Sequence, residues 1–113
     1  MAGGEHDDDR DGTVREFHEA VNMTAGELDK WLATDESAGV GQSDGGESVG
    51  HSSGRRIVGL LRTRKADLTD DDLAHMRKVV GYVHRHVAQR PAGDVTATRW
   101  RYSLMNWGHD PEK

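Results

Sequence analysis

The segment between residues 70 and 89 constrains the fold of this chain more strongly than any other feature. Apolar side chains recur along it with helical spacing and define one face, which consists of Leu73, Met76, Val80, Val83 and Val87. Thr69 is a typical N-cap residue, the run Asp70–Asp72 complements the positive end of the helix dipole, and Arg90-Pro91 ends the pattern. An amphipathic helix is stable in water only when other elements cover its apolar face, so this segment predicts a helical bundle.

Two helices are predicted before it. The first begins at Thr13 and places Val14, Phe17 and Val21 on one face. The second opens at Thr24, whose spacing from Glu27 is that of a capping box, in which each residue caps the other's backbone N–H group. Both helices are short, so we expect them to pack against the longer helix.

A third predicted helix runs from about residues 52–54 to about Lys65, and a last helix covers roughly residues 96–107. No segment shows the sustained alternation of a β-strand. We therefore expect an all-α fold, a small single-domain bundle of about five helices over residues 13–111, with residues 112–113 as a tail.

Two segments lack helical signals. Residues 1–12 form an acidic lead that cannot bury apolar surface, which predicts disorder. Residues 35–54 contain six glycines and five serines and predict a flexible loop. Within that loop, the run Val49-Gly50-His51 is unusual for a linker, so we expect residues 47–54 to dock on the bundle while residues 36–46 stay mobile.

Composition excludes several classes of protein. The 113 residues include no cysteine, which excludes disulfides and a thiol nucleophile. The longest apolar run, residues 57–61, is far shorter than the roughly 20 residues of a membrane span, and the N-terminus has no apolar signal segment. We expect a cytoplasmic protein that does not enter the membrane.

The net charge of −5 is distributed unevenly. Residues 1–54 carry 3 basic and 13 acidic side chains, residues 55–90 carry 9 basic and 4 acidic ones, and residues 91–113 carry three of each. A cationic block of this kind fits an anionic partner such as nucleic acid, but it also fits an ordinary solvated helix surface.

Helical geometry groups the basic residues. In the segment 70–89, cations surround a tyrosine on the face opposite the apolar stripe, and in the preceding helix two arginines flank Gly59. Cations beside an aromatic ring suit phosphate and base contacts. We therefore predict a nucleic-acid-binding surface that consists of Arg55, Arg62, Arg64, Lys78, Tyr82, Arg85 and Gln89. Arg99 and Tyr102 are a possible extension.

Other functions stay open. The same surface would suit a protein partner or a homodimer, with the acidic lead covering it in the free chain. A metal-dependent enzyme would need His51, His84 and His109 to converge in space. No nucleophile and base stand at a telling spacing, so the sequence assigns no catalytic residue, no metal ligand and no cofactor, and an enzyme is the least supported class.

Four segments of the chain are similar to one family. They are Val21-Asn22-Met23-Thr24, Glu47-Ser48-Val49-Gly50-His51, the run from His75 to His86, and the run from Arg99 to Pro111. Over about residues 14–111 the chain resembles domain of unknown function 3140, a family of short bacterial and fungal proteins. The resemblance implies no catalytic site. Some members carry a DNA-binding label. The resemblance therefore implies DNA in preference to RNA as the partner, and a nucleoid-associated location if this chain binds DNA.

Overall fold

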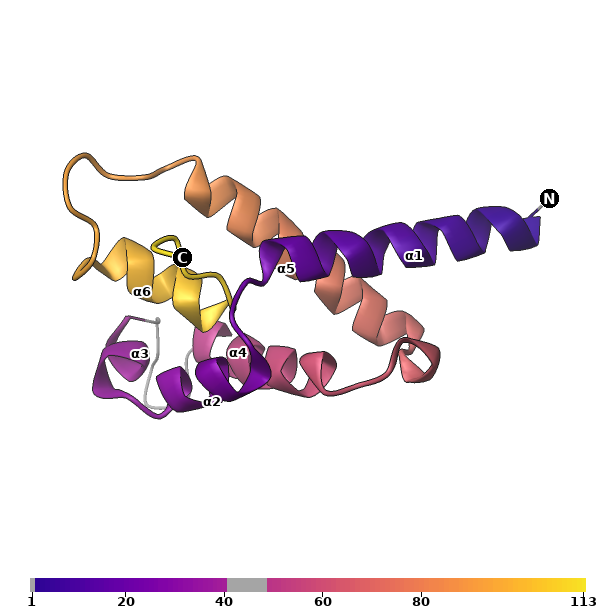
Figure 1. Ribbon diagram of the computed structural model, residues 1–113, viewed down its shortest axis with the longest axis horizontal. Coiled ribbons are helices and arrows are strands. Elements are labelled where there is room, and N and C mark those ends of the chain that lie inside the picture. Colours follow the sequence, from indigo (N-terminus) through magenta and orange to yellow (C-terminus); the bar gives the residue numbers. More distant parts are fainter. Residues whose placement is uncertain (1, 41–48) are drawn as a thin grey trace.

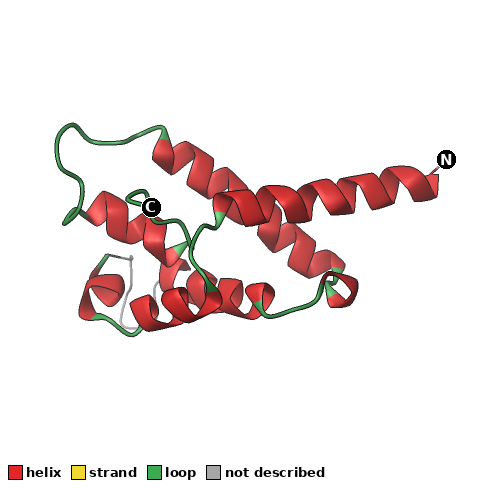
Figure 2. Ribbon diagram, in the orientation of Figure 1, coloured by secondary structure: helices red, strands yellow, loops and turns green. Residues whose placement is uncertain are grey.

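The computed structural model describes residues 2–40 and 49–113, and within those ranges it contains helices and connecting segments but no β-strand (Figure 2). The predicted all-α class is therefore confirmed. The helices are α1 (Ala2–Ala20), α2 (Ala25–Leu32), α3 (Asp35–Gly39), α4 (Val49–Leu61), the 3-10 turn η1 (Lys65–Asp67), α5 (Asp70–Val87) and α6 (Arg99–Asn106). No helix in these ranges is long and apolar enough to cross a membrane.

The helices pack as two crossed pairs joined by α6. Figure 1 shows α1 crossing α5, with the N-terminal part of α1 projecting beyond the other helices, and α2 lying beside α4. The short helix α6 contacts α2, α3, α4 and α5. Because of these contacts, the last helix of the chain holds the two pairs together.

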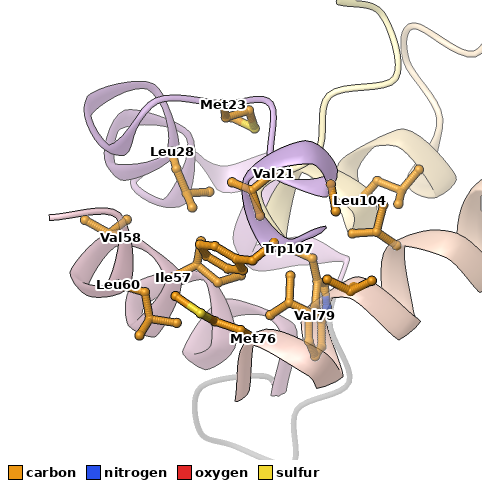
Figure 3. Packing of buried hydrophobic residues seen from close by; sticks show 14 of the residues in the cluster. Val21, Met23, Leu28, Ile57, Val58, Leu60, Met76, Val79, Leu104 and Trp107 are labelled. Carbon is orange, nitrogen blue, oxygen red and sulfur yellow. The ribbon is translucent and has the colours of Figure 1, made fainter. Parts of the chain in front are cut away.

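One apolar core runs between these helices (Figure 3). Its most deeply buried large side chains come from five different helices: Phe17, Leu28, Ile57, Met76 and Leu104. The predicted face of α5 is correct for Leu73, Met76, Val80 and Val83 but not at its end, because Val87 is 40% exposed. Val79, which the sequence analysis left out of that face, is fully buried instead.

Helix starts follow the predicted caps. Thr24 and Thr69 both form complete capping boxes, with Glu27 and Asp72 respectively. Thr98 caps α6 by accepting a hydrogen bond from the backbone N–H of Arg101, so this helix begins three residues later than predicted. The described residues contain six α-helices and a 3-10 turn, one α-helix more than the predicted bundle.

The N-terminal residues depart from the prediction. Residues 2–12, expected to be disordered, continue α1 as a helix. Arg10 and Asp11 hold this part of the helix: the Arg10 guanidinium donates to the carbonyl oxygens of Lys65 (2.7 Å) and Leu68 (2.8 Å), and Asp11 forms an ion pair with Lys65. The sequence analysis counted apolar residues and missed these polar contacts to a distant turn.

The predicted loop over residues 35–54 is partly helical. Its first residues form α3, and its last residues form the first turns of α4, which begins at residue 49 instead of residues 52–54. His51 Nε2 lies 2.6 Å from the carbonyl oxygen of Leu32, and Ser53 is buried. Residues 50–54 therefore pack on the bundle, and the expected docking of residues 47–48 falls outside the described residues. The expected mobility of residues 36–46 is wrong for residues 36–40, which belong to α3 and its C-cap and include the fully buried Ser37, and for residues 41–46 it falls outside the described residues.

The end of α4 is also earlier than predicted. The helix stops at Leu61, not near Lys65, and the Thr63 hydroxyl donates to the carbonyl oxygen of Gly59 just beyond it (2.7 Å). The chain then turns through η1 into α5. The exposed faces of α4 and α5 therefore follow each other along the chain, separated by η1.

Two segments that carry the family resemblance pair with each other. The Asn22 amide donates to the carbonyl oxygen of Asp110 (2.9 Å) and its side-chain oxygen accepts from the Asp110 backbone N–H (2.7 Å). Arg101 holds the Asp110 carboxylate with two hydrogen bonds of 3.1 Å. Burial raises the pKa of Asp110, but the hydrogen bonds from Arg101 and the Glu112 backbone, together with the positive charges of Arg101 and Lys113, lower it overall. These hydrogen bonds connect the end of α1 to the segment that follows α6.

Candidate nucleic-acid interface

The outward side of α4 is a basic ridge. Arg55, Arg56, Gly59 and Arg62 are exposed, while Ile57, on the opposite side, is fully buried. A Cβ atom added at Gly59 would meet no other atom within 4 Å. An unobstructed position on the helix next to arginine side chains allows the phosphate backbone of a nucleic acid to approach closely.

The outward side of α5 continues this basic character. Lys78, Arg85 and Gln89 are exposed, as predicted from the helical spacing. The Arg85 guanidinium lies along its own helix: its Nη1 atom is 3.1 Å from the position that a Cβ atom at Gly81 would take. We call the exposed residues Arg55, Arg56, Arg62, Lys78 and Arg85 the basic surface.

Cations at the turn between the two helices are less available. The Arg64 guanidinium donates to the Asp67 carboxylate (3.1 Å), and Lys65 pairs with Asp11 of α1. Exposed ion pairs are weak, so an anion can displace these partners at small cost. Arg64 therefore lies at the edge of the basic surface with an acidic neighbour.

Tyr82 does not lie among the cations as an exposed ring. It is half-buried in a stack of four nearly parallel rings in the order His75, Trp107, Tyr82, His86. Its ring centroid is 4.2 Å from that of Trp107 and 4.8 Å from that of His86. Both faces of the ring are covered, so the prediction that Tyr82 offers a free stacking platform is wrong. Helical spacing identified the face of α5 but not the tryptophan that α6 brings against it.

His75, which sequence reasoning placed only at the border of the basic face, has a defined position where α4 meets α5. Its Nε2 atom is 3.0 Å from the Ser53 hydroxyl of α4, and its ring stacks on Trp107 at 6.3 Å. Burial, and then the positive charges of Arg56 and Lys78, lower the pKa of His75. Burial likewise lowers the pKa of His86.

The predicted extension at the last helix lies away from the α4–α5 faces. The Arg99 guanidinium donates to the carbonyl oxygen of Gly39 at 3.4 Å, and the half-buried Tyr102 ring packs against Trp31 with a centroid distance of 5.3 Å. Both residues belong to the side of the molecule formed by α2, α3 and α6, where the contacts described are structural.

Only two of the three histidines considered for a metal site come together. His84 and His109 line a hollow of about 290 Å³ together with Glu19, above the apolar side chains of Ala20, Val83 and Val87. His109 Nδ1 lies 2.8 Å from the carbonyl oxygen of Ala20, whereas His51 lies at α2. Among the side chains that the structure describes, those of residues 10–40 and 50–113, no three from His, Asp or Glu are placed to hold a metal ion.

Together these features define a class: a small all-helical domain that exposes arginine and lysine side chains on α4 and α5. Its family follows from comparison with known proteins. The model of the family described as "Protein of unknown function (DUF3140)" matches residues 16–105, and the chain belongs to this family. Searches of curated proteins and of solved structures found no match.

Proposed function

We propose that this protein binds nucleic acid without catalysis, DNA in preference to RNA, through the basic surface. The observation that carries the proposal is that two helices consecutive in the chain both expose cations. On α4, Arg55 and Arg62 lie on either side of Gly59, whose Cβ position is unobstructed. On α5, the exposed cations are Lys78 and Arg85. Residues 55–90 carry 9 basic and 4 acidic side chains, so this half of the domain is cationic although the whole chain is acidic.

The charge pattern also favours one mode of contact. A recognition helix presents its N-terminal residues to the major groove, but α5 begins with three exposed or partly exposed aspartates that would face phosphates. Contact through the sides of α4 and α5 avoids this repulsion. Such contacts go to the phosphate backbone, so we expect weak sequence preference and steep salt dependence.

Reversing two charges on this surface tests the proposal. The double variant Arg62→Glu with Arg85→Glu is expected to bind a labelled DNA duplex about tenfold or more weakly at about 50 mM salt, because both phosphate contacts are lost and replaced by repulsion. Fluorescence anisotropy over a salt series measures both the affinity and its slope. The slope is expected to become shallower by about one for each lost contact.

A matched control carries the same charge change elsewhere. Arg15 and Lys30 are exposed on α1 and α2, and the double variant Arg15→Glu with Lys30→Glu alters the net charge equally. This control is expected to keep most of the affinity. Equal losses in both double variants would show only a net-charge effect, and absence of binding by the wild type to DNA and RNA at low salt would reject the proposal.

The acidic residues before Arg10 are expected to compete with nucleic acid. Arg10 and Asp11 anchor α1 at the turn between α4 and α5, so in the sequence the acidic run Asp7–Asp9 directly precedes a segment bound to this turn. Replacing the three aspartates by asparagine is expected to raise DNA affinity about threefold at low salt, with the gain disappearing at high salt. The anisotropy assay measures both effects.

The alternative is a protein-interaction module or a homodimer. Deletion of residues 1–9, which spares Arg10 and Asp11, distinguishes the two. A change in sedimentation behaviour without any nucleic-acid binding would favour the interaction module. A gain in binding without a change in oligomeric state would favour nucleic acid.

A further inference from the structure

The junction between α4 and α5 holds a half-buried imidazole between cations that come from both helices. His75 is joined to α4 through the Ser53 hydroxyl, which is itself 5% exposed, and its ring rests on Trp107 of α6. Arg56 extends from α4 and Lys78 from α5, and both side chains are exposed. We call Arg56, His75 and Lys78 the junction site.

The charges around His75 are mixed but mainly positive. From α4 it faces Arg56 and the uncharged Ser53, from α5 it faces Lys78 and Asp72, and from α6 it faces the uncharged Trp107. Arg56 reaches the Asp72 carboxylate only at 3.4 Å. Burial, Arg56 and Lys78 together keep the pKa of His75 below its ordinary value, and Asp72 opposes them. The imidazole is thus poised to gain a proton if negative charge arrives nearby.

We propose that the junction site binds a phosphate group of the nucleic-acid backbone and takes up a proton on His75 when it does so. This inference rests on the proposed function for its ligand. A phosphate held by Arg56 and Lys78 would neutralise the two cations that disfavour the imidazolium and would add a favourable charge beside it. His75 would then be a binding residue whose contribution depends on pH.

The direction of the pH effect follows from linkage. Binding raises the pKa of His75, so the bound state holds more protons than the free state over the interval between the two pKa values. Affinity must therefore rise as the pH falls through that interval. We expect a rise of about threefold to tenfold between about pH 7.5 and 5.5, since a tenfold rise corresponds to a pKa difference of about one.

The first test needs no DNA. Imidazole resonances of the wild-type protein are followed by NMR over a pH series in sodium sulfate and in sodium chloride at equal ionic strength. Sulfate mimics a phosphate group, and its charge is constant over this range. The pKa of His75 is expected to be higher in sulfate, whereas His84, which is exposed on the same helix beside Arg85, is expected to respond less. Equal responses would overturn the junction site.

The second test uses a DNA duplex and the anisotropy assay over the same pH range. His75→Gln is expected to flatten the pH dependence of affinity, and the control His84→Gln, which removes an exposed imidazole from the same helix, is expected to retain it. If His75→Gln does not fold, Lys78→Met serves instead: Lys78 is exposed, and its loss should weaken the response of His75 to sulfate.

The two tests separate the two proposals. DNA binding with an unchanged pH profile in His75→Gln, and no specific response of His75 to sulfate, would overturn the junction site and leave the proposed function standing. A specific response to sulfate without DNA binding at any pH would support an anion site at His75 and overturn the nucleic-acid function.

Discussion

Replacing Asn106 with leucine is expected to lower the free energy of unfolding by about 3 to 5 kcal/mol, because three polar groups lose a buried partner. Asn106 is 1% exposed; its side-chain oxygen accepts from the Trp31 indole N–H (2.8 Å) and the Ser37 hydroxyl (2.5 Å), and its amide donates to the carbonyl oxygen of Ser37 (3.1 Å). Leucine satisfies none of these groups. A loss of this size approaches the whole stability of a marginal domain.

Urea unfolding followed by circular dichroism measures the effect. Gln89→Leu is the matched control, since it makes the same amide-to-leucine change at an exposed position on the same chain. We expect the control to alter the free energy of unfolding by less than about 0.5 kcal/mol. A loss below about 1 kcal/mol in Asn106→Leu would contradict the role assigned to Asn106.

The second large effect is expected at Gly54, where α4 touches α2 and α6. A Cβ atom at this position would lie 2.5 Å from the backbone oxygen of Asn106 and 2.7 Å from a methyl carbon of Leu32. The backbone oxygen cannot rotate away, so Gly54→Ala must push α4 from α6. We expect a loss of about 3 kcal/mol in the free energy of unfolding, at the upper end of what overpacking usually costs.

Gly59 provides a control on the same helix, because its substitution by alanine is expected to change the free energy of unfolding in the opposite direction. Because nothing lies within 4 Å of its Cβ position, Gly59→Ala is expected to stabilise the domain by about 0.5 to 1 kcal/mol through the higher helix propensity of alanine. Urea unfolding of both variants tests the pair. Similar changes in the two variants would mean that α4 does not approach α6 as closely as the structure shows.

The sequence predicted a helix well where the interaction that starts the helix lies within one helical turn. Thr24 and Thr69 cap helices because a side-chain oxygen reaches a backbone N–H three residues away, which spacing alone reveals. Residues 2–12 were missed because their contacts are distant in the sequence. α3 was missed although Thr34 supplies a local cap by accepting a hydrogen bond from the Ser37 backbone N–H (3.1 Å), and the burial of α3 depends on a distant residue. Arg10 depends on a turn more than 50 residues away, and Ser37 on Asn106.

In the candidate site, too, the features that depend on a single helix were predicted and those that depend on several helices were not. The exposure of Arg55, Arg62, Lys78 and Arg85 follows from helical periodicity, because it depends only on which side of a helix faces the core. The covering of Tyr82 and the bond between Ser53 and His75 depend on how α4, α5 and α6 meet. No pattern within a single helix contains that information.

The hydrogen bonds between Asn22 and Asp110 have a consequence for how the chain folds. The two residues are 88 positions apart, and the backbone N–H of Met23 also donates to the carbonyl oxygen of Gly108 (3.2 Å). During synthesis, α1 and α2 emerge long before the segment that secures their junction. The early helices must therefore wait, with their apolar faces incompletely covered, until residues 99–110 have left the ribosome. Contacts this far apart in the sequence raise the contact order of the domain, and a higher contact order slows folding relative to a bundle held by local contacts.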